Sequence, residues 1–121
     1  MGLLAVAFLT GIALSQNQDK PVEKTNRPLK ILTRPRPTYP EEARRNHVEG
    51  TVKLMITYET DGSIGEVICI NEDDVKKAKL VKYGVVAAVI EAAKKITFDP
   101  EIKDGEPITV KRGWEYTIKI Y

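Results

Sequence analysis

The sequence predicts an α+β domain in which three antiparallel strands, in the order 2-1-3, carry two helices on one face. Residues 51–59 alternate between apolar and polar side chains and lead into an Asp-Gly pair, which is typical of a strand entering a hairpin. Residues 85–93 repeat apolar side chains at steps of three and four, which is typical of one helix face. Residues 114–121 alternate again. With a short charged helix in front, the predicted order is α-β-β-α-β.

Size and composition favour one small domain. The chain has 121 residues, of which 42% are hydrophobic and 30% charged, and a formal net charge of +2. Acidic and basic residues are interleaved, so no basic surface predicts a nucleic-acid partner. Cys69 is the only cysteine and His47 the only histidine, which excludes an intramolecular disulfide and argues against a zinc site. Without a nucleophile elbow or phosphate loop, the sequence predicts no enzyme, cofactor or metal.

Residues 1–15 are predicted to be a targeting segment. Residues 3–14 are uncharged and apolar, a run shorter than the roughly 20 residues of a membrane-spanning helix. Ala13 and Ser15 have the spacing of a signal-peptide cleavage site before Gln16. We therefore expect export by a signal peptide. The alternatives are a retained membrane anchor whose start has been trimmed and a buried N-terminal helix.

Residues 16–36 are predicted to be an extended and mobile linker, and residues 37–121 the folded domain. The linker region is polar and rich in proline, which removes a backbone donor and pushes the preceding residue to extended geometry. The domain begins near Tyr39, placed to pack as a hydrophobic staple. Residues 40–46 then predict a short helix, with proline and two glutamates in its first turn and two arginines at its end.

The next two segments predict a hairpin. In the first strand the expected core-facing residues are Val52, Leu54, Ile56 and Tyr58. Asp61 and Gly62 supply the turn. In the return strand, led in by Ile64, Val67 and Cys69 are expected to face the core and Ile68 and Ile70 the opposite side.

Residues 71–96 predict helix, with an apolar stripe at Val85, Val86, Val89, Ile90 and Ala93. Gly84 is a candidate start of the packed part, with residues 73–83 as a looser lead-in. Residues 97–107 are rich in turn formers, and residues 108–121 predict a long final strand that bends or bulges at Gly113. In a purely antiparallel sheet the final strand lies beside the first, so the second and final strands are both edges.

A set of short motifs occurs in a fixed order along this chain. These are Tyr-Pro, a short helix with alanine, Glu-Gly-x-Val, an Asp-Gly turn, an alanine-rich helix, aromatic-x-Pro, and a Gly-containing turn into the last strand. Their structural positions are Tyr39, Pro40, Gly50, Asp61, Gly62, Phe98, Pro100 and Gly105. In order and spacing they resemble the TonB C-terminal domain family, with a TonB/TolA C-terminal-like fold, over about residues 37–121.

The resemblance implies a periplasmic interaction domain that binds an extended segment of an outer-membrane receptor, in transport across the envelope. The receptor segment would add as a strand, because an edge strand offers free backbone donors and acceptors. The implied partner-binding edge is the last strand: Gly113, Trp114, Glu115, Tyr116, Thr117, Ile118, Lys119, Ile120 and Tyr121. Alternatively, this strand only closes the domain, and Lys111, Arg112 and Lys119 guard its edge.

The sequence departs from the energy transducers of that family. Those carry a membrane-spanning N-terminus with a motor-contacting histidine and a long proline-rich spacer, whereas here no histidine precedes His47 and the linker is brief. The alternative is a stand-alone periplasmic adaptor, or a self-associating homodimer formed by edge pairing, without energy transduction. Inner-membrane motor proteins are expected partners only if the N-terminus is membrane-anchored.

Other polar and aromatic positions favour structural roles. His47 is expected at the surface or near a cap, and Cys69 in the core. Residues 72–74 are three acids that lack the glycine and distal glutamate of an EF-hand loop, so they predict helix capping rather than calcium binding. The basic residues between 76 and 82 predict a solvated helix face. Trp114 and Tyr116 are expected in the core rather than as a ligand platform.

Overall fold

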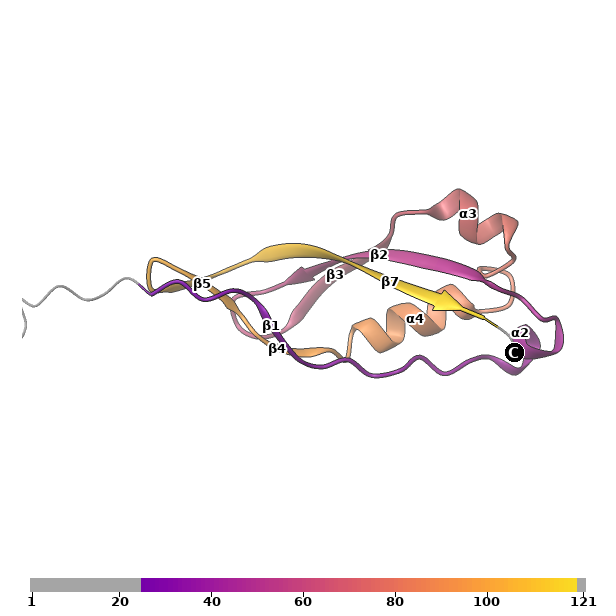
Figure 1. Ribbon diagram of the computed structural model, residues 1–121, viewed down its shortest axis with the longest axis horizontal. Coiled ribbons are helices and arrows are strands. Elements are labelled where there is room, and N and C mark those ends of the chain that lie inside the picture. The colour runs from indigo at the N-terminus through magenta and orange to yellow at the C-terminus, as the bar shows by residue number, and fades with distance from the viewer. Residues whose placement is uncertain (1–24, 120–121) are drawn as a thin grey trace, which may run out of the picture.

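The computed structural model describes residues 25–119 and shows an α+β fold with antiparallel sheets, which confirms the predicted fold class (Figure 1). The helices are α2 (Glu41–Arg45), α3 (Glu72–Lys77) and α4 (Val85–Ala93). The strands are β1 (Lys30–Thr33), β2 (Gly50–Tyr58), β3 (Ile64–Cys69), β4 (Thr97–Asp99), β5 (Glu101–Lys103), β6 (Glu106–Ile108) and β7 (Val110–Ile118). The predicted targeting segment, residues 1–15, lies outside the described residues.

The main sheet has three strands in the order β3-β2-β7, and both pairings are antiparallel. β2 is therefore the central strand, and β3 and β7 are the two edges. β2 and β7 pair over their whole length in one register, from Gly50 opposite Ile118 to Tyr58 opposite Val110. Among the described residues, no helix is long and apolar enough to cross a membrane.

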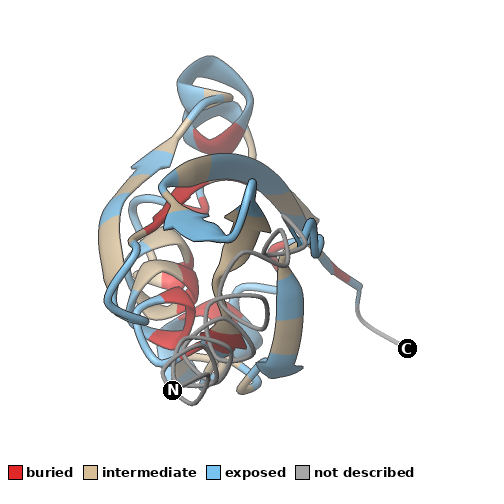
Figure 2. Ribbon diagram, turned by 90° about the vertical axis from the view of Figure 1, so that its left-hand side faces the viewer, coloured by how far each residue is buried: buried red, intermediate tan, exposed pale blue. Residues whose placement is uncertain are grey.

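The core lies between this sheet and α4. On β2, Val52, Leu54 and Ile56 have no exposed surface and Tyr58 has 2%, as the alternation predicts. The stripe of α4 packs against them, and the buried residues gather in the interior of the molecule (Figure 2). Burying the apolar face of a helix on the apolar face of a sheet is the main driving force for such a two-layer fold.

The prediction of two helices is wrong, because residues 71–96 form two separate helices, α3 and α4. Leu80 is fully buried between them, and its amide donates to the carbonyl of Val75 at 2.8 Å. Gly84 adopts the left-handed conformation, with φ of 79°, directly before α4. The chain leaves the helix after α3 to bury Leu80, and a glycine makes the turn back because it has no Cβ to clash there. Gly84 is thus the start of the packed helix.

The linker prediction also needs correction in its C-terminal part. Residues 30–33 form β1, which pairs antiparallel with β4, and Arg27 bridges to Ile102. Ile31 lies opposite Phe98, and Leu29 and Ile31 pack against the core. Apolar burial therefore orders a stretch that its prolines had marked as irregular. The predicted turn-rich connection contains β4 and the β5–β6 hairpin.

No bulge occurs at Gly113, contrary to the prediction. The glycine lies opposite Met55 in an unbroken register, and it is not among the residues with positive φ. The final strand begins at Val110 rather than 108, because residues 106–108 pair with β5 instead.

Candidate functional site: the open edge of strand β7

The outer edge of β7 is identified by the hydrogen bonds of its neighbour β2. The Lys53 amide donates to the Oδ1 atom of Asn71 at 3.0 Å, and the Lys53 carbonyl accepts from the amide of Ile70 at 2.8 Å. Both backbone groups of Lys53 thus point towards β3. Its register partner on β7 is Glu115, so this is a non-hydrogen-bonded pair of the β2–β7 ladder.

The backbone N–H and C=O of Glu115 therefore point away from β2. Because this orientation repeats every second residue along a strand, the same holds for Gly113 and Thr117. Among residues 25–119, no hydrogen bond engages these outward backbone groups. The next outward carbonyl, that of Lys111, accepts from the Arg112 guanidinium at 2.9 Å. The open part of the edge, called the free edge below, is residues 113–117.

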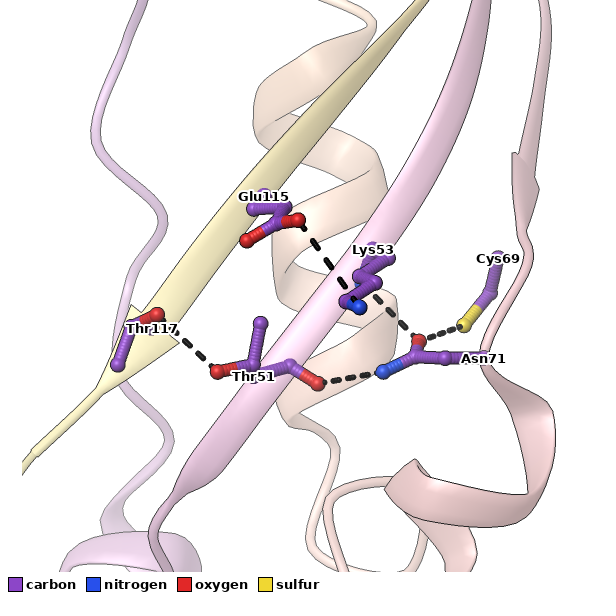
Figure 3. A network of polar contacts seen from close by, with 6 residues as sticks. All are labelled: Thr51, Lys53, Cys69, Asn71, Glu115 and Thr117. Atoms are coloured by element: carbon purple, nitrogen blue, oxygen red, sulfur yellow. Dashed lines mark hydrogen bonds and ion pairs between the residues drawn. The ribbon is translucent and has the colours of Figure 1, made fainter.

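Polar side chains fix the free edge in register from the solvent face of the sheet (Figure 3). The hydroxyls of Thr51 and Thr117 lie 3.1 Å apart, and Lys53 Nζ lies 4.0 Å from a carboxylate oxygen of Glu115. The Asn71 amide donates to the carbonyl of Thr51 at 2.8 Å. These contacts join β7, β2 and the end of β3, so the strand that carries the free edge is linked across the whole sheet.

A groove lies between the end of β7 and an extended segment, residues 34–39, which we call the strap. The groove has a volume of about 620 Å³ and is lined by Arg36, Tyr39, Tyr116, Thr117, Ile118 and Lys119. The strap alternates as an extended chain does. Its two prolines, Pro35 and Pro37, are half-buried beside α4, whereas Arg34 and Arg36 are exposed.

Arg34 attaches the strap to the main sheet. Its guanidinium carbon lies 5.1 Å from the ring centroid of Trp114, a cation–π contact. Burial raises the pKa of the Tyr58 phenol above its usual 10.0, and the positive charge of the nearby Arg34 partly opposes the shift. One arginine of the strap therefore contacts Trp114 of β7 and lies close enough to Tyr58 of β2 for its charge to affect that phenol.

The predicted site residues divide between the two faces of β7. Trp114, Tyr116 and Ile118 pack against the core, with Ile118 buried and the two aromatics half-buried. Tyr116 also lines the groove, so it is more than the core residue that the sequence predicts. Glu115 and Thr117 face solvent. Ile120 and Tyr121 lie outside the described residues.

The three cations predicted to guard the edge have different surroundings. Arg112 forms an ion pair with Glu101 at 2.8 Å and so leans towards the β5–β6 hairpin. Lys111 is exposed, and Lys119 lines the groove. Sequence reasoning missed Arg34 and Arg36. The sequence signal for them was the alternation Arg-Pro-Arg-Pro. Prolines at every second position favour an extended chain, and in an extended chain the arginines between them point to the same side.

The family-motif residues build the fold around the edge. The Tyr39 hydroxyl donates to the carbonyl of Val48 at 3.0 Å, fixing the strap to the start of β2. The Phe98 ring meets Tyr58 edge-on, with centroids 4.9 Å apart. At Gly50, a Cβ would lie 3.0 Å from Cδ1 of Leu80. Gly62 and Gly105 take positive φ in the two turns. Pro40 precedes α2 and Pro100 lies between β4 and β5.

The Asp61 carboxylate closes the β2–β3 turn. It accepts hydrogen bonds from the amide of Ser63 at 3.0 Å and from its hydroxyl at 2.6 Å. These bonds stabilise the ionised form and lower the pKa of Asp61 below its usual value. Within residues 25–119, no three histidine, cysteine or acidic side chains lie close enough together to hold a metal ion. The chemistry that this region offers is backbone hydrogen bonding beside a basic and aromatic groove.

Comparison with known proteins identifies the family. Residues 35–118 match the family model described as Gram-negative bacterial TonB protein C-terminal. The chain is also similar to the solution NMR structure of the Pseudomonas aeruginosa TonB C-terminal domain, with 25% sequence identity and a TM-score of 0.57. That alignment covers 76% of this chain and 86% of the other. No curated protein sequence matches. This chain belongs to the family of Gram-negative bacterial TonB protein C-terminal domains.

Proposed function

We propose that this chain binds an extended segment of an outer-membrane receptor by strand addition at the free edge of β7. The observation that carries the proposal is the row of outward backbone groups at Gly113, Glu115 and Thr117, which no hydrogen bond engages among the described residues. An added strand would pair with these groups, and its alternate side chains would contact the two faces of β7. In such recognition the main-chain bonds supply affinity and the side-chain contacts supply specificity.

Family membership supports a periplasmic location and a role in protein interaction. TonB C-terminal domains are periplasmic interaction domains, not enzymes, and they act in transport across the cell envelope. We infer that this domain works in the periplasm, exported or tethered there by residues 1–15. Whether it also transmits force from inner-membrane motor proteins depends on that segment being retained as a membrane anchor.

Self-association is a second candidate, favoured by the other edge of the sheet. Among residues 25–119, β3 pairs with β2 alone, so within the described part of the chain it too has an unpaired side. Two copies could join edge to edge and leave a stand-alone periplasmic module without a receptor. Light scattering over a range of concentrations tests this second candidate, since a mass of one chain at every concentration would exclude self-association.

A proline substitution at Glu115 tests strand addition. The Glu115 amide points outward and takes no part in the β2–β7 ladder, so Glu115→Pro removes a donor from the free edge and leaves that ladder complete. Proline is tolerated on edge strands in this orientation. Glu115→Ala is the matched control, because it removes the same side chain and keeps the amide.

The probe is a synthetic peptide of alternating valine and threonine, added to the full chain. We expect amide hydrogen exchange at Gly113, Glu115 and Thr117 to slow when the peptide binds. Glu115→Pro should weaken binding by about tenfold or more, the worth of a lost hydrogen bond together with the unpaired peptide acceptor. Protection elsewhere in the domain, or equal binding by the proline and alanine variants, would overturn the proposal.

A further inference from the structure

We propose that the strap is the second wall of the binding site, and that it selects an added strand carrying a carboxylate on the side chains that face the groove. This inference rests on the proposed strand addition at β7 and names the partner's chemistry: an acidic extended peptide segment. Arg36, on the strap, and Lys119, just after β7, are the residues that would read the carboxylate.

The geometry sends every second side chain of an added strand into the groove. Neighbouring strands place side chains of one face in a continuous row. On the core-facing side of β7 that row contains Tyr116 and Ile118, and the rest of the groove lining is Arg36, Tyr39, Thr117 and Lys119. Groove-facing side chains of the partner therefore contact aromatic and aliphatic surface with two cations beside it.

The charge of the groove is one-sided. Two of its six lining residues are basic and none is acidic. Among residues 25–119, neither Arg36 nor Lys119 forms an ion pair, whereas Arg112 is paired with Glu101 and Lys53 with Glu115. The groove thus holds two cations that form no ion pair among the described residues, and a carboxylate would complement them.

The opposite face of β7 has no such preference. There Glu115 lies beside Lys53, and Thr117 shares a hydrogen bond with Thr51. A carboxylate on the solvent-facing row of an added strand would meet a matched ion pair and neutral hydroxyls. Selection for acid should therefore depend on which row the acid occupies, which a general attraction between a basic protein and an acidic peptide would not show.

The strap presents Arg36 in a prearranged backbone. Pro35 and Pro37 flank the arginine and are half-buried beside Ala88 and Ala92 of α4. Tyr39 follows, anchored through its hydroxyl to the carbonyl of Val48. Because proline fixes its own φ and extends its predecessor, Arg36 loses little backbone freedom when it binds. A guanidinium also matches a carboxylate with two parallel hydrogen bonds.

Four peptides test the inference against the full chain. All alternate valine and threonine, so that the valine row fixes which side chains face the groove. One pair replaces a central valine by glutamate or by glutamine, and the other pair makes the same replacements at a central threonine. We expect glutamate to bind about three- to tenfold more tightly than glutamine on the valine row, and equally on the threonine row. Added salt should reduce the difference.

Variants assign the effect to the groove. Arg36→Gln together with Lys119→Gln should make glutamate and glutamine peptides bind equally. Lys103→Gln is the control, since it removes one positive charge from an exposed position on β5, at the far end of the molecule from the end of β7 (Figure 1). It should leave the preference unchanged.

The possible outcomes distinguish failure of acid selection from failure of the proposed strand addition at β7. If all peptides slow exchange at Glu115 and Thr117 but glutamate and glutamine bind alike on both rows, strand addition stands and acid selection is overturned. An equal glutamate preference on both rows, or one that survives the double substitution, also overturns it. If no peptide slows exchange at those amides, the proposed function fails and the inference fails with it.

Discussion

The guanidinium of Arg34 lies 5.1 Å from the ring centroid of Trp114 and joins the strap to the strand whose edge is open. The two residues are far apart in sequence, one in a proline-rich stretch before the first helix and the other in the middle of β7. Their contact means that the groove has two walls built into one domain. It also makes the single tryptophan of the chain a reporter of the strap.

Removing this contact should loosen the strap without unfolding the domain. We expect Arg34→Ala to lower the free energy of unfolding by about 0.5–1 kcal/mol, the size of an exposed cation–π interaction. The fluorescence of Trp114 should change in the folded state as well, because its ring loses a covering cation. Arg45→Ala is the matched control, an exposed arginine on α2. An unchanged Trp114 spectrum in Arg34→Ala would contradict the contact.

Asn71 should be sensitive to a change of one atom. Its side-chain oxygen accepts from the amide of Lys53, and its NH2 group donates to the carbonyl of Thr51. Asn71→Asp keeps the acceptor and loses the donor, so two oxygens would face one another. We expect a loss of about 1–3 kcal/mol in the free energy of unfolding, measured by urea denaturation.

Asn46→Asp is the control for that substitution. The Asn46 amide also donates to a backbone carbonyl, that of Glu42 at 2.8 Å, but at an exposed site where water can replace it. Its cost should stay within about 0.5 kcal/mol. If the two substitutions lowered the free energy of unfolding equally, the hydrogen bonds of Asn71 between β2 and the end of β3 would contribute no more than the exposed bond of Asn46.

Gly50 should resist enlargement, whereas Gly113 should accept it. A Cβ at Gly50 would lie 3.0 Å from Cδ1 of Leu80 and 3.2 Å from Cβ of Ala78, both tighter than ordinary contact. At Gly113 the closest atom, the Leu54 carbonyl oxygen, would be 3.6 Å away. We expect Gly50→Ala to cost about 1–3 kcal/mol, by overpacking the residues between α3 and α4. Thermal melting of both variants gives the comparison, and a destabilised Gly113→Ala would show that the free edge is more constrained than its contacts indicate.

Asp61 should contribute to stability only above acidic pH. Its pKa is lowered in the folded state by hydrogen bonds from Ser63, so the folded chain holds this proton less tightly than the unfolded chain does. Its contribution is therefore present above the usual pKa of 3.8 and is lost as the pH falls through the lower folded value. Urea denaturation of Asp61→Asn should show a shallower decline of stability over this acid range than the native chain. An identical decline would mean that the turn does not favour the carboxylate.

Much of the fold could be predicted from the sequence because its signals are local. The alternation at Val52, Leu54, Ile56 and Tyr58 assigned the buried face of β2, and the Asp-Gly pair assigned the hairpin turn. The stripe that begins at Val85 assigned the face of α4. Each of these depends on the period of one element, and burial of one face preserves that period.

The corrections came from contacts between distant segments. Nothing in the prolines around residues 28–37 shows that Ile31 will lie opposite Phe98, and this pairing turns part of a predicted linker into a strand. The burial of Leu80 divides one predicted helix into two. The unbroken register at Gly113 depends on its partner Met55 in β2. In each case a long-range contact outweighs a local propensity.

The sequence by itself determined the class of fold, the strand that forms the edge and the absence of any familiar catalytic motif. Only the tertiary structure decided which backbone groups of that edge face outward, since this depends on how Lys53 bonds to Asn71 and Ile70 on the other side of the sheet. It also decided that Arg36 and Lys119 share a groove. Periodicity records which side chains are buried, but the direction of hydrogen bonds and the meeting of distant charges are set only when strands and strap pack together.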